Sequence, residues 1–333
     1  MVFLHPLKKR IMSKILGIGN ALVDVIVSLD NEDLFEQFNL KKGGMEMIDA
    51  ETKRALHEVI KVMKRTLASG GSTSNTIHGL AHLGAQTGYI GKVSNDDAGK
   101  FFKEDMERNH ITPHLLDSKI DTGIATTLMT ADAERTFATY LGAAATMEAD
   151  EINEEIFKNY DYIHVEGYLI FNRGLIERVC KLAKKCGLKI SMDMASYNLV
   201  EQNRTFIDSL LANYVDIIFA NEEEAKAFTG KEEYEALEIL SQYCETAVVK
   251  LGHRGSLAKI NGKVSVIPAV KANCIDTNGA GDIYASGFLY GLMNGYSAEK
   301  AGALASRLSA ELVETVGAKL SDKQWSKILS EVF

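Results

Sequence analysis

The sequence predicts an α/β protein in which a doubly wound, mostly parallel sheet is flanked by helices and carries a small β-sheet lid. Short apolar runs alternate with helix-period segments over most of the 333 residues, which is the pattern of βαβ units. A hydrophobic content of 46% allows one large core. Two segments, residues 22–49 and 120–140, interrupt this alternation with β-branched, alternating stretches that predict a separate sheet.

The main sheet is expected to use the short apolar runs that end in turn residues. These are residues 15–19, 87–93, 162–167, 189–194, 216–221 and 246–252. Helices with an apolar face are expected at 74–84, 97–109, 172–186, 203–212, 221–229, 232–243, 282–294 and 297–315. The chain has three prolines and neither a repeat nor a low-complexity linker, which predicts one domain from residue 13 to 333. Residues 1–12 are expected to form a poorly ordered leader.

Composition excludes several classes of function. The formal net charge is −8 and there is no basic stripe, which argues against a nucleic-acid-binding protein. The apolar residues at the start are too few to span a bilayer and precede the basic ones, the reverse of a secretory signal. The cysteines form no C-x-x-C pair, which indicates reduced thiols: Cys180, Cys186, Cys244 and Cys274. We therefore expect a cytoplasmic protein, without membrane contacts, whose partner is a small molecule.

The string DTNGAGD, residues 276–282, precedes a predicted small-residue helix. Its glycine-rich turn predicts an anion site, because the amides of residues 279–281 would point outward at the positive end of a helix dipole. Asp282 in the first helical turn could orient an alcohol and accept its proton while these amides hold a transferring phosphoryl group. A helix cap with a glycine turn would explain one aspartate but not the whole string. No G-x-x-x-x-G-K-[ST] motif occurs.

Two further stretches predict a site for hydroxyl groups. In SGGSTSN, residues 69–75, the glycines let backbone approach a ligand, and Asn75 can bond hydroxyls through its amide oxygen and nitrogen. A glycine turn with a Ser or Thr cap is the structural alternative. Asp24 in GIGNALVD could accept bonds from vicinal sugar hydroxyls, or could form an Asx turn. Because Leu22 replaces the third glycine of a dinucleotide motif, a dehydrogenase is disfavoured.

Two strand ends predict the donor side of the same site. Asn221 and Glu224 of NEEEA could hold a hydrated magnesium ion, whereas acidic residues in a first helical turn are also explained by the helix dipole. Gly252 and Gly255 of VVKLGHRGSLA permit a nucleotide to lie against backbone, although a tight hairpin would require the same residues.

With these motifs in this order, the chain resembles the PfkB (ribokinase-like) family of carbohydrate and nucleoside kinases from about residue 17 to residue 317. The strings SGGSTSN, YVDIIFANEEEA and DTNGAGD are most similar to its adenosine kinase branch. The resemblance implies a doubly wound sheet with a β lid, ATP as donor, Mg²⁺, and in many members stimulation by a monovalent cation such as K⁺.

The resemblance also implies roles for individual residues. Asp282 would be the catalytic base, and Gly279, Ala280 and Gly281 the anion hole. The acceptor-binding residues would be Asp24, Gly71 and Asn75, and the group that organises magnesium and phosphate would be Asn221 and Glu224. The nucleotide-side turn would be Gly252 and Gly255.

Two other residues match the family less directly. Arg135 of ERTFATYLGAA resembles a basic lid residue that closes over the phosphates. Ser306 stands where relatives often carry Asn or His near the donor adenine, which leaves donor preference open.

We expect an ATP- and Mg²⁺-dependent kinase that phosphorylates a primary hydroxyl, namely the 5′-OH of adenosine or a close nucleoside. The alternative within the family is a free-sugar kinase acting on ribose, fructose or a related sugar. Outside the family, a non-catalytic sugar- or nucleoside-binding protein would not need Asp282 beside an anion turn. Lid strands with exposed edges can pair between two copies, so the sequence does not choose between a monomer and a homodimer.

Overall fold

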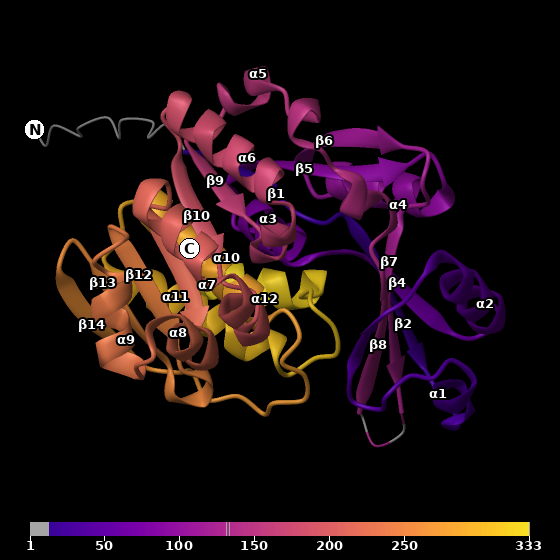
Figure 1. Ribbon diagram of the computed structural model, residues 1–333. Helices are drawn as coiled ribbons and strands as arrows, with labels where there is room; N and C mark the ends of the chain where they lie inside the picture. The colour runs from indigo at the N-terminus through magenta and orange to yellow at the C-terminus, as the bar shows by residue number, and fades with distance from the viewer. Residues whose placement is uncertain (1–12, 131, 133, 333) are drawn as a thin grey trace, which may run out of the picture.

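The computed structural model describes residues 13–130, 132 and 134–332, so the predicted leader at residues 1–12 lies outside the described residues. Among the described residues, nine strands form one sheet in the order β14-β13-β12-β11-β10-β9-β1-β5-β6. Five others form a smaller sheet in the order β3-β8-β7-β2-β4. The smaller sheet stands to one side of the main body, at the right of Figure 1. The predicted α/β fold with a mostly parallel sheet and a smaller second sheet is confirmed.

The main sheet is parallel from β6 to β12 and antiparallel at its other edge. Its strands are β1 (Lys14–Ile18), β5 (Gln86–Ser94), β6 (Ile111–Ser118), β9 (Tyr162–Val165), β10 (Lys189–Asp193), β11 (Ile217–Asn221), β12 (Thr246–Lys250), β13 (Ser256–Ile260) and β14 (Lys263–Ile267). The apolar runs of the sequence did not predict the two edge strands, β6 and β14. In β6, Pro113 and several half-buried positions weaken the apolar signal, as suits an edge strand.

Helices cover both faces of this sheet because its strands are apolar on both sides. In β11, Ile217 and Phe219 enter one core cluster, whereas Ile218 and Ala220 enter the other. One face packs against α3 (Ser72–His82), α4 (Asp97–Arg108), α10 (Ala280–Met293), α11 (Ala298–Leu312) and α12 (Asp322–Val332). The other packs against α6 (Arg173–Lys185), α7 (Tyr197–Asn213), α8 (Glu222–Thr229) and α9 (Glu233–Leu240), with the short α5 (Glu154–Phe157) beside α6.

Several helices differ from the sequence prediction, which contains neither α5 nor two helices of the smaller-sheet region, α1 (Asp33–Gln37) and α2 (Ala50–Ile60). Helix α7 begins at Tyr197 rather than at residue 203, because the Ser196 side chain accepts a capping bond from the Leu199 amide at 3.4 Å and a kink at Asn203 lies inside the helix. Helix α12 is not among the predicted helices. It docks through Trp325, which stacks on His82 of α3 with ring centroids 4.8 Å apart.

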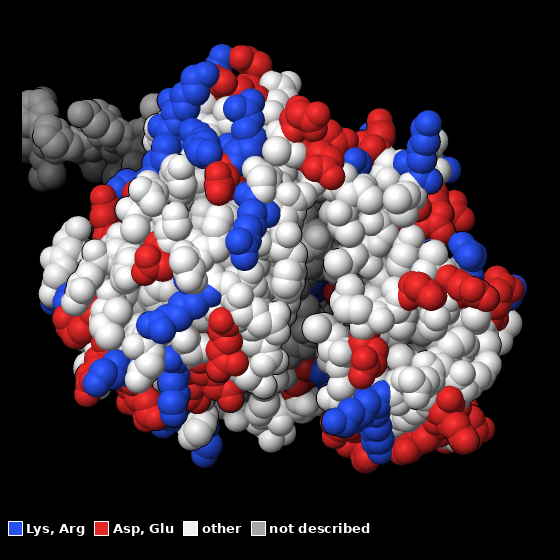
Figure 2. Space-filling view, in the orientation of Figure 1, with Lys and Arg blue, Asp and Glu red and all other residues white. Residues whose placement is uncertain are grey.

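The smaller sheet contains β2 (Leu22–Ser28), β3 (Met45–Met47), β4 (Arg65–Gly70), β7 (Gly123–Met129) and β8 (Arg135–Tyr140), flanked by α1 (Asp33–Gln37) and α2 (Ala50–Ile60). Strand β4 lies outside both segments from which this sheet was predicted, and it runs directly into α3. Figure 2 shows a furrow between this sheet and the main body, and acidic and basic side chains intermingled over much of the visible face.

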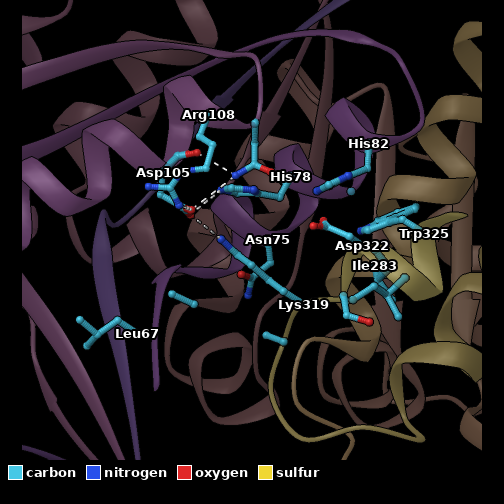
Figure 3. A pocket seen from close by; sticks show the side chains of 16 residues that line it. Leu67, Asn75, His78, His82, Asp105, Arg108, Ile283, Lys319, Asp322 and Trp325 are labelled. Carbon is cyan, nitrogen blue, oxygen red and sulfur yellow. Dashed lines mark hydrogen bonds and ion pairs between the residues drawn. The ribbon is translucent and has the colours of Figure 1, made fainter. Parts of the chain in front are cut away.

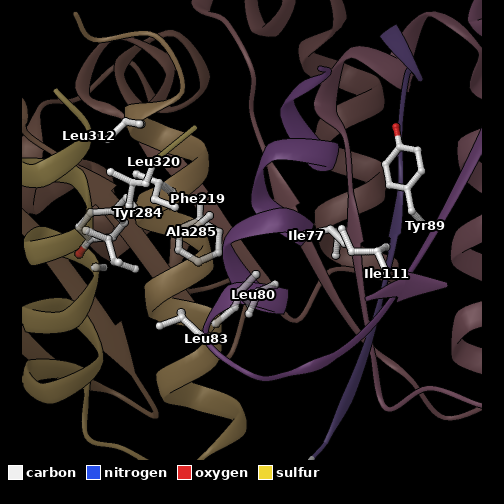
Figure 4. Packing of buried hydrophobic residues seen from close by; sticks show 14 of the residues in the cluster. Ile77, Leu80, Leu83, Tyr89, Ile111, Phe219, Tyr284, Ala285, Leu312 and Leu320 are labelled. Carbon is white, nitrogen blue, oxygen red and sulfur yellow. The ribbon is translucent and has the colours of Figure 1, made fainter. Parts of the chain in front are cut away.

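A close contact between α3 and α10 positions the residues described below. A Cβ added at Gly79 would lie 2.7 Å from Cβ of Ser286, so only glycine permits this approach. Ser286 Oγ donates to the carbonyl oxygens of Thr76 and Asp282, both at 2.9 Å, and therefore joins the two helices. Figure 4 shows the apolar side chains that pack along them, among them Leu80 from α3. The start of α10 is thereby held beside the start of α3.

Candidate active site

The glycine turn before α10 leaves backbone amides free at the helix start. Gly279 has a φ of +73°, which favours glycine, and directly precedes the first helical residue, Ala280. Ala280 N–H donates to the Thr277 carbonyl oxygen at 3.1 Å. The amides of Gly279, Gly281 and Asp282 have no acceptor among the described residues. Two of the three predicted amides, together with that of Asp282, are thus free to bind an anion at the positive end of the helix dipole.

Asp282 is half-buried in the first turn of α10, and α3 holds its carboxylate. Oδ1 accepts a hydrogen bond from Ser72 Oγ at 2.7 Å, and Oδ2 accepts one from Asn75 Nδ2 at 2.9 Å. Burial raises the pKa of Asp282 to about 6, while the bonds from Asn75 and Ser72 oppose that rise. The carboxylate is therefore oriented and more basic than an exposed aspartate.

A cleft of about 850 Å³ opens beside this carboxylate. Predicted site residues from four segments line it: Asn221, Glu224, Gly252, Gly255, Gly279, Ala280, Gly281, Asp282 and Ser306. Asp193 also lines it and forms an ion pair with Lys250 at 2.7 Å. A Cβ added at Gly281 would lie 3.1 Å from Lys250 Nζ, so this ammonium group lies next to the free amides. The Lys250 ammonium group and the free amides can bind the negative charge of a polyphosphate, and the glycine turns let it approach the backbone.

Glu224 is buried where β11 meets α8 and forms a capping box with Asn221. Its carboxylate accepts from the Asn221 backbone N–H at 2.7 Å and from Asn221 Nδ2 at 2.8 Å. Burial, and secondly the charge of Asp193, raise the pKa of Glu224 to about 7. In the described part of the chain, no three His, Cys, Asp or Glu side chains gather closely enough to bind a metal ion directly. These oxygen donors fit a Mg²⁺ ion that keeps most of its waters.

The predicted acceptor residues do not line the 850 Å³ cleft, and Asn75 instead lines a second cavity, described below. Gly71 precedes α3 with a φ of +94°, and Asp24 on β2 lies against Gly70, where a Cβ would collide with its carboxylate. Asn75 is 8% exposed, and its Oδ1 has no donor among the described residues. A ligand hydroxyl would satisfy this atom. Burial raises the pKa of Asp24 to about 7.

Glu166 joins these residues although the sequence offered no motif for it. It follows β9, is 2% exposed and accepts from Asn20 Nδ2 at 2.5 Å and from Thr73 N–H at 3.2 Å. Burial raises its pKa to about 7. Asp193 likewise ends β10. Both stand at the carboxyl ends of parallel strands, where open α/β sheets bind ligands, and that rule could have identified them.

A second cavity of about 420 Å³ lies between α3, α4, α10 and α12 (Figure 3). Lys319 extends into it toward His78 and Asp105, and its ammonium group contacts Ser69 Oγ and lies 3.3 Å from an Asp105 carboxylate oxygen. Burial lowers the pKa of Lys319 to about 8. The ammonium group of Lys319 is therefore paired with side chains of the protein itself.

Arg135 is predicted to close over the phosphates, and the structure places its guanidinium elsewhere. It lies at the start of β8 and forms an ion pair with the buried Asp276. It is absent from the residues that line the 850 Å³ cleft. In this conformation the side chain reaches the beginning of the anion loop rather than the space beside its amides.

The fold and this site are those of a phosphoryl-transfer enzyme, and the comparisons agree. The model of the pfkB family carbohydrate kinases matches residues 39–325, and the chain belongs to this family. It is an ATP-dependent phosphotransferase that phosphorylates a sugar or a nucleoside. Kinases of this family use ATP and typically Mg²⁺.

Relatives of two kinds are similar over most of the chain. A 5-dehydro-2-deoxygluconokinase of Geobacillus thermodenitrificans is 29% identical over 75% of this chain and 79% of its own length. The crystal structure of adenosine kinase from Sinorhizobium meliloti is 30% identical with a TM-score of 0.84, covering 96% of this chain and 99% of that one. A probable sugar kinase from Rhizobium etli CFN 42 is 28% identical with the same TM-score, at 96% and 98% coverage.

In the part of the chain that the structure describes, no helix is both long and apolar enough to cross a bilayer.

Proposed function

We propose that the protein transfers the γ-phosphoryl group of ATP to the 5′-OH of adenosine. The observation that carries this choice is the chemistry of the acceptor side, where Asp24, Glu166 and the Oδ1 of Asn75 are all hydrogen-bond acceptors and the Asn75 Oδ1 has no donor among the described residues. The vicinal diol of a neutral nucleoside supplies donors for them. A sugar acid would bring its carboxylate against two acidic side chains, Asp24 and Glu166.

Asp282 acts as the base in this proposal. Ser72 and Asn75 aim its carboxylate, which orients the 5′-OH and accepts its proton, while the free amides of Gly279 and Gly281 hold the charge on the transferring group. Phosphoryl transfer depends on positioning more than on early proton removal, so a pKa of about 6 is sufficient for Asp282.

The donor binds in the 850 Å³ cleft, with the adenosine part of ATP against Gly252, Gly255 and Ser306 and the phosphates toward Lys250. Glu224, with Asn221, would hold hydrated Mg²⁺, which offsets the negative charge of the phosphates. Stimulation by K⁺ stays a prediction of the resemblance, as does the choice between monomer and homodimer.

The smaller sheet serves as a lid in the same proposal. It carries Asp24 and borders the furrow of Figure 2, so its movement would admit the acceptor and exclude water. The lid is built from residues 22–49, 65–70 and 120–140 within a single domain that spans 13–333. A cytoplasmic location is consistent with the free cysteines, of which Cys180 and Cys244 are buried.

A substrate panel tests the proposal. ADP release would be measured with ATP and Mg²⁺ and with adenosine, inosine, cytidine, ribose, fructose, fructose 6-phosphate and 5-dehydro-2-deoxygluconate. We expect the highest kcat/KM for adenosine. A free sugar or sugar acid that is converted far faster than every nucleoside would replace adenosine by the alternative, a free-sugar kinase of the same family.

A further inference from the structure

Asp276 is the point where three segments of the site meet. It is 4% exposed, its Oδ1 accepts from the Asn278 N–H at 2.8 Å, and its Oδ2 accepts from the Gly317 N–H at 2.6 Å. Its backbone N–H donates to the Val313 carbonyl oxygen at 3.1 Å. One carboxylate thus ties the anion loop to the segment that follows α11.

The cation that balances this carboxylate comes from the smaller sheet. The Arg135 side chain is 12% exposed, and its Nη1 forms the ion pair with Asp276. Its Nη2 is buried and has no hydrogen-bond partner in the described structure. A buried carboxylate that lost this partner would keep an uncompensated charge, which is strongly destabilising. The conformation of the anion loop therefore depends on the position of the Arg135 guanidinium, which is set by β8.

Residues 317 and 318, which follow α11, connect the Arg135–Asp276 ion pair to the free amides of the anion loop. A Cβ added at Gly279 would lie 2.6 Å from the Cβ of Ala318, so the loop rests directly on residue 318. A Cβ at Gly317 would lie 3.4 Å from Ile26 of β2, so the same segment also lies against the smaller sheet. The Asp276 carboxylate accepts hydrogen bonds from the N–H of Asn278, just before Gly279, and from the N–H of Gly317, just before Ala318. A shift of its carboxylate would therefore move the Gly279 and Gly281 amides.

We propose that Arg135 is a positioning residue whose ion pair with Asp276 sets the amides of the anion loop when the smaller sheet lies against the main body. The inference rests on the proposed function and deepens it. The guanidinium acts through Asp276 rather than on a phosphate. Acceptor binding under the smaller sheet and phosphate binding at Gly279 and Gly281 are consequently coupled, although Arg135 touches neither ligand.

Four variants and a control test this proposal: R135M, R135K, D276N, R135M/D276N and K42M. Lys42 also lies in the smaller-sheet region, but it pairs with the exposed Glu32 and Asp132, so K42M removes a cation at a distance from the loop. Thermal unfolding and circular dichroism would establish that each variant is folded. The double variant removes both charges and keeps the test open if D276N alone does not fold.

The first readout is hydrogen exchange of the hydrogen-bonded loop amides, those of Asp276, Asn278 and Ala280, in ligand-free protein. We expect exchange at least about tenfold faster in R135M and D276N, partial restoration in R135K, and wild-type exchange in K42M. The second readout is the affinity for a non-hydrolysable ATP analogue with and without adenosine. We expect a coupling of about 5- to 150-fold in the wild type, and loss of this coupling in R135M, D276N and the double variant to a similar extent.

Two results would overturn the proposal. One is unchanged exchange in R135M, and the other is a double variant whose loss is the product of the single losses, as expected for an arginine that acts on the phosphate directly. A wild-type enzyme that does not bind adenosine would instead contradict the proposed function. The exchange readout needs no substrate and would still decide whether Arg135 orders the loop.

Discussion

Asn75 and Asp282 lie 207 residues apart in the chain, yet Asn75 Nδ2 donates a hydrogen bond to Asp282 Oδ2 at 2.9 Å. The bond exists because α3 and α10 begin side by side and approach closely at Gly79. It fixes the carboxylate of the proposed base beside Asn75, a proposed acceptor residue. The contact between the two helices therefore positions the proposed base.

Replacing Asp282 by Asn should lower kcat by about 10²- to 10⁴-fold, because the variant cannot accept the proton of the hydroxyl. Adenosine affinity should stay within a few-fold, since the new amide side chain can accept from Asn75 Nδ2 through its oxygen and donate to Ser72 Oγ through its nitrogen. ADP release and calorimetric titration would measure the two effects. The matched control is D150N, at an exposed aspartate outside the site. Equal losses of kcat and affinity would make Asp282 a binding or structural residue instead.

The rate should fall in acid with an apparent pKa near 6. Burial raises the pKa of Asp282 above its usual value of 3.8 to about 6, so the carboxyl group is protonated, and cannot act as a base, below that pH. A pH profile of kcat from pH 4.5 to 9 at saturating substrates would show this limb. An acid limb near pH 4 would mean that Asp282 titrates like an exposed aspartate or is not the base.

The same shift predicts the pH dependence of stability. A folded-state pKa above the unfolded value means that the native state binds the proton more tightly, so stability is highest below about pH 4 for this group and falls as pH rises through 6. D282N lacks this ionisation and should unfold at a temperature at least equal to that of the wild type at pH 8. Scanning calorimetry of both proteins at pH 5 and pH 8 measures it. A D282N protein whose deficit grows with pH would contradict the sign.

Asp24→Ala should raise the KM for adenosine about 10- to 100-fold, as expected for the loss of bonds worth about 1.5–3 kcal/mol to a charged group. With 2′-deoxy- or 3′-deoxyadenosine the penalty should shrink, because one hydroxyl partner is already missing. D30A, at an exposed aspartate just after β2, is the control. An equal penalty with all three acceptors would place Asp24 away from the diol.

Glu224→Gln should raise the Mg²⁺ concentration for half-maximal activity about 10-fold or more, because an outer ligand loses its charge. Gln can still accept from the Asn221 N–H, so the capping box and the helix should persist. The measurement is a magnesium titration at constant MgATP. E235Q, at an exposed glutamate on α9, is the control. An unchanged Mg²⁺ requirement in E224Q would remove Glu224 from the metal site.

Gly79→Ala should destabilise the fold by about 1–3 kcal/mol and lower kcat, since its Cβ would force α3 away from Ser286 and move Asn75 relative to Asp282. Gly174→Ala is the matched helical control, because a Cβ there meets only Asn172 Oδ1, at 3.9 Å. That variant should be neutral or slightly more stable. Urea unfolding and ADP release would measure both. A fully active G79A enzyme would show that the helix contact does not position the base.

Much of the fold could be predicted because its signals are local. The strands of the parallel core are apolar on both faces, and their periodicity is visible along the chain. Strands β4, β6 and β14 and helices α1, α2, α5 and α12 were not predicted, because edge strands and short or docking helices depend on neighbours from other segments. Within the site, the glycine turns and the Asn221–Glu224 capping box are also local features, and their motifs predicted where they lie.

The sequence by itself determined the sheet core, the glycine turn before α10 and the amide-rich helix start, because these follow from side-chain periodicity and backbone sterics within a few residues. Only the tertiary structure brought Glu166 beside Asn20, Asp193 beside Lys250, and Arg135 onto Asp276. Such contacts join residues from distant segments, and nothing in the local pattern of either partner specifies the other. Burial, which shifts the pKa values of Asp24, Glu166, Glu224 and Asp282, likewise arises only when the chain has folded.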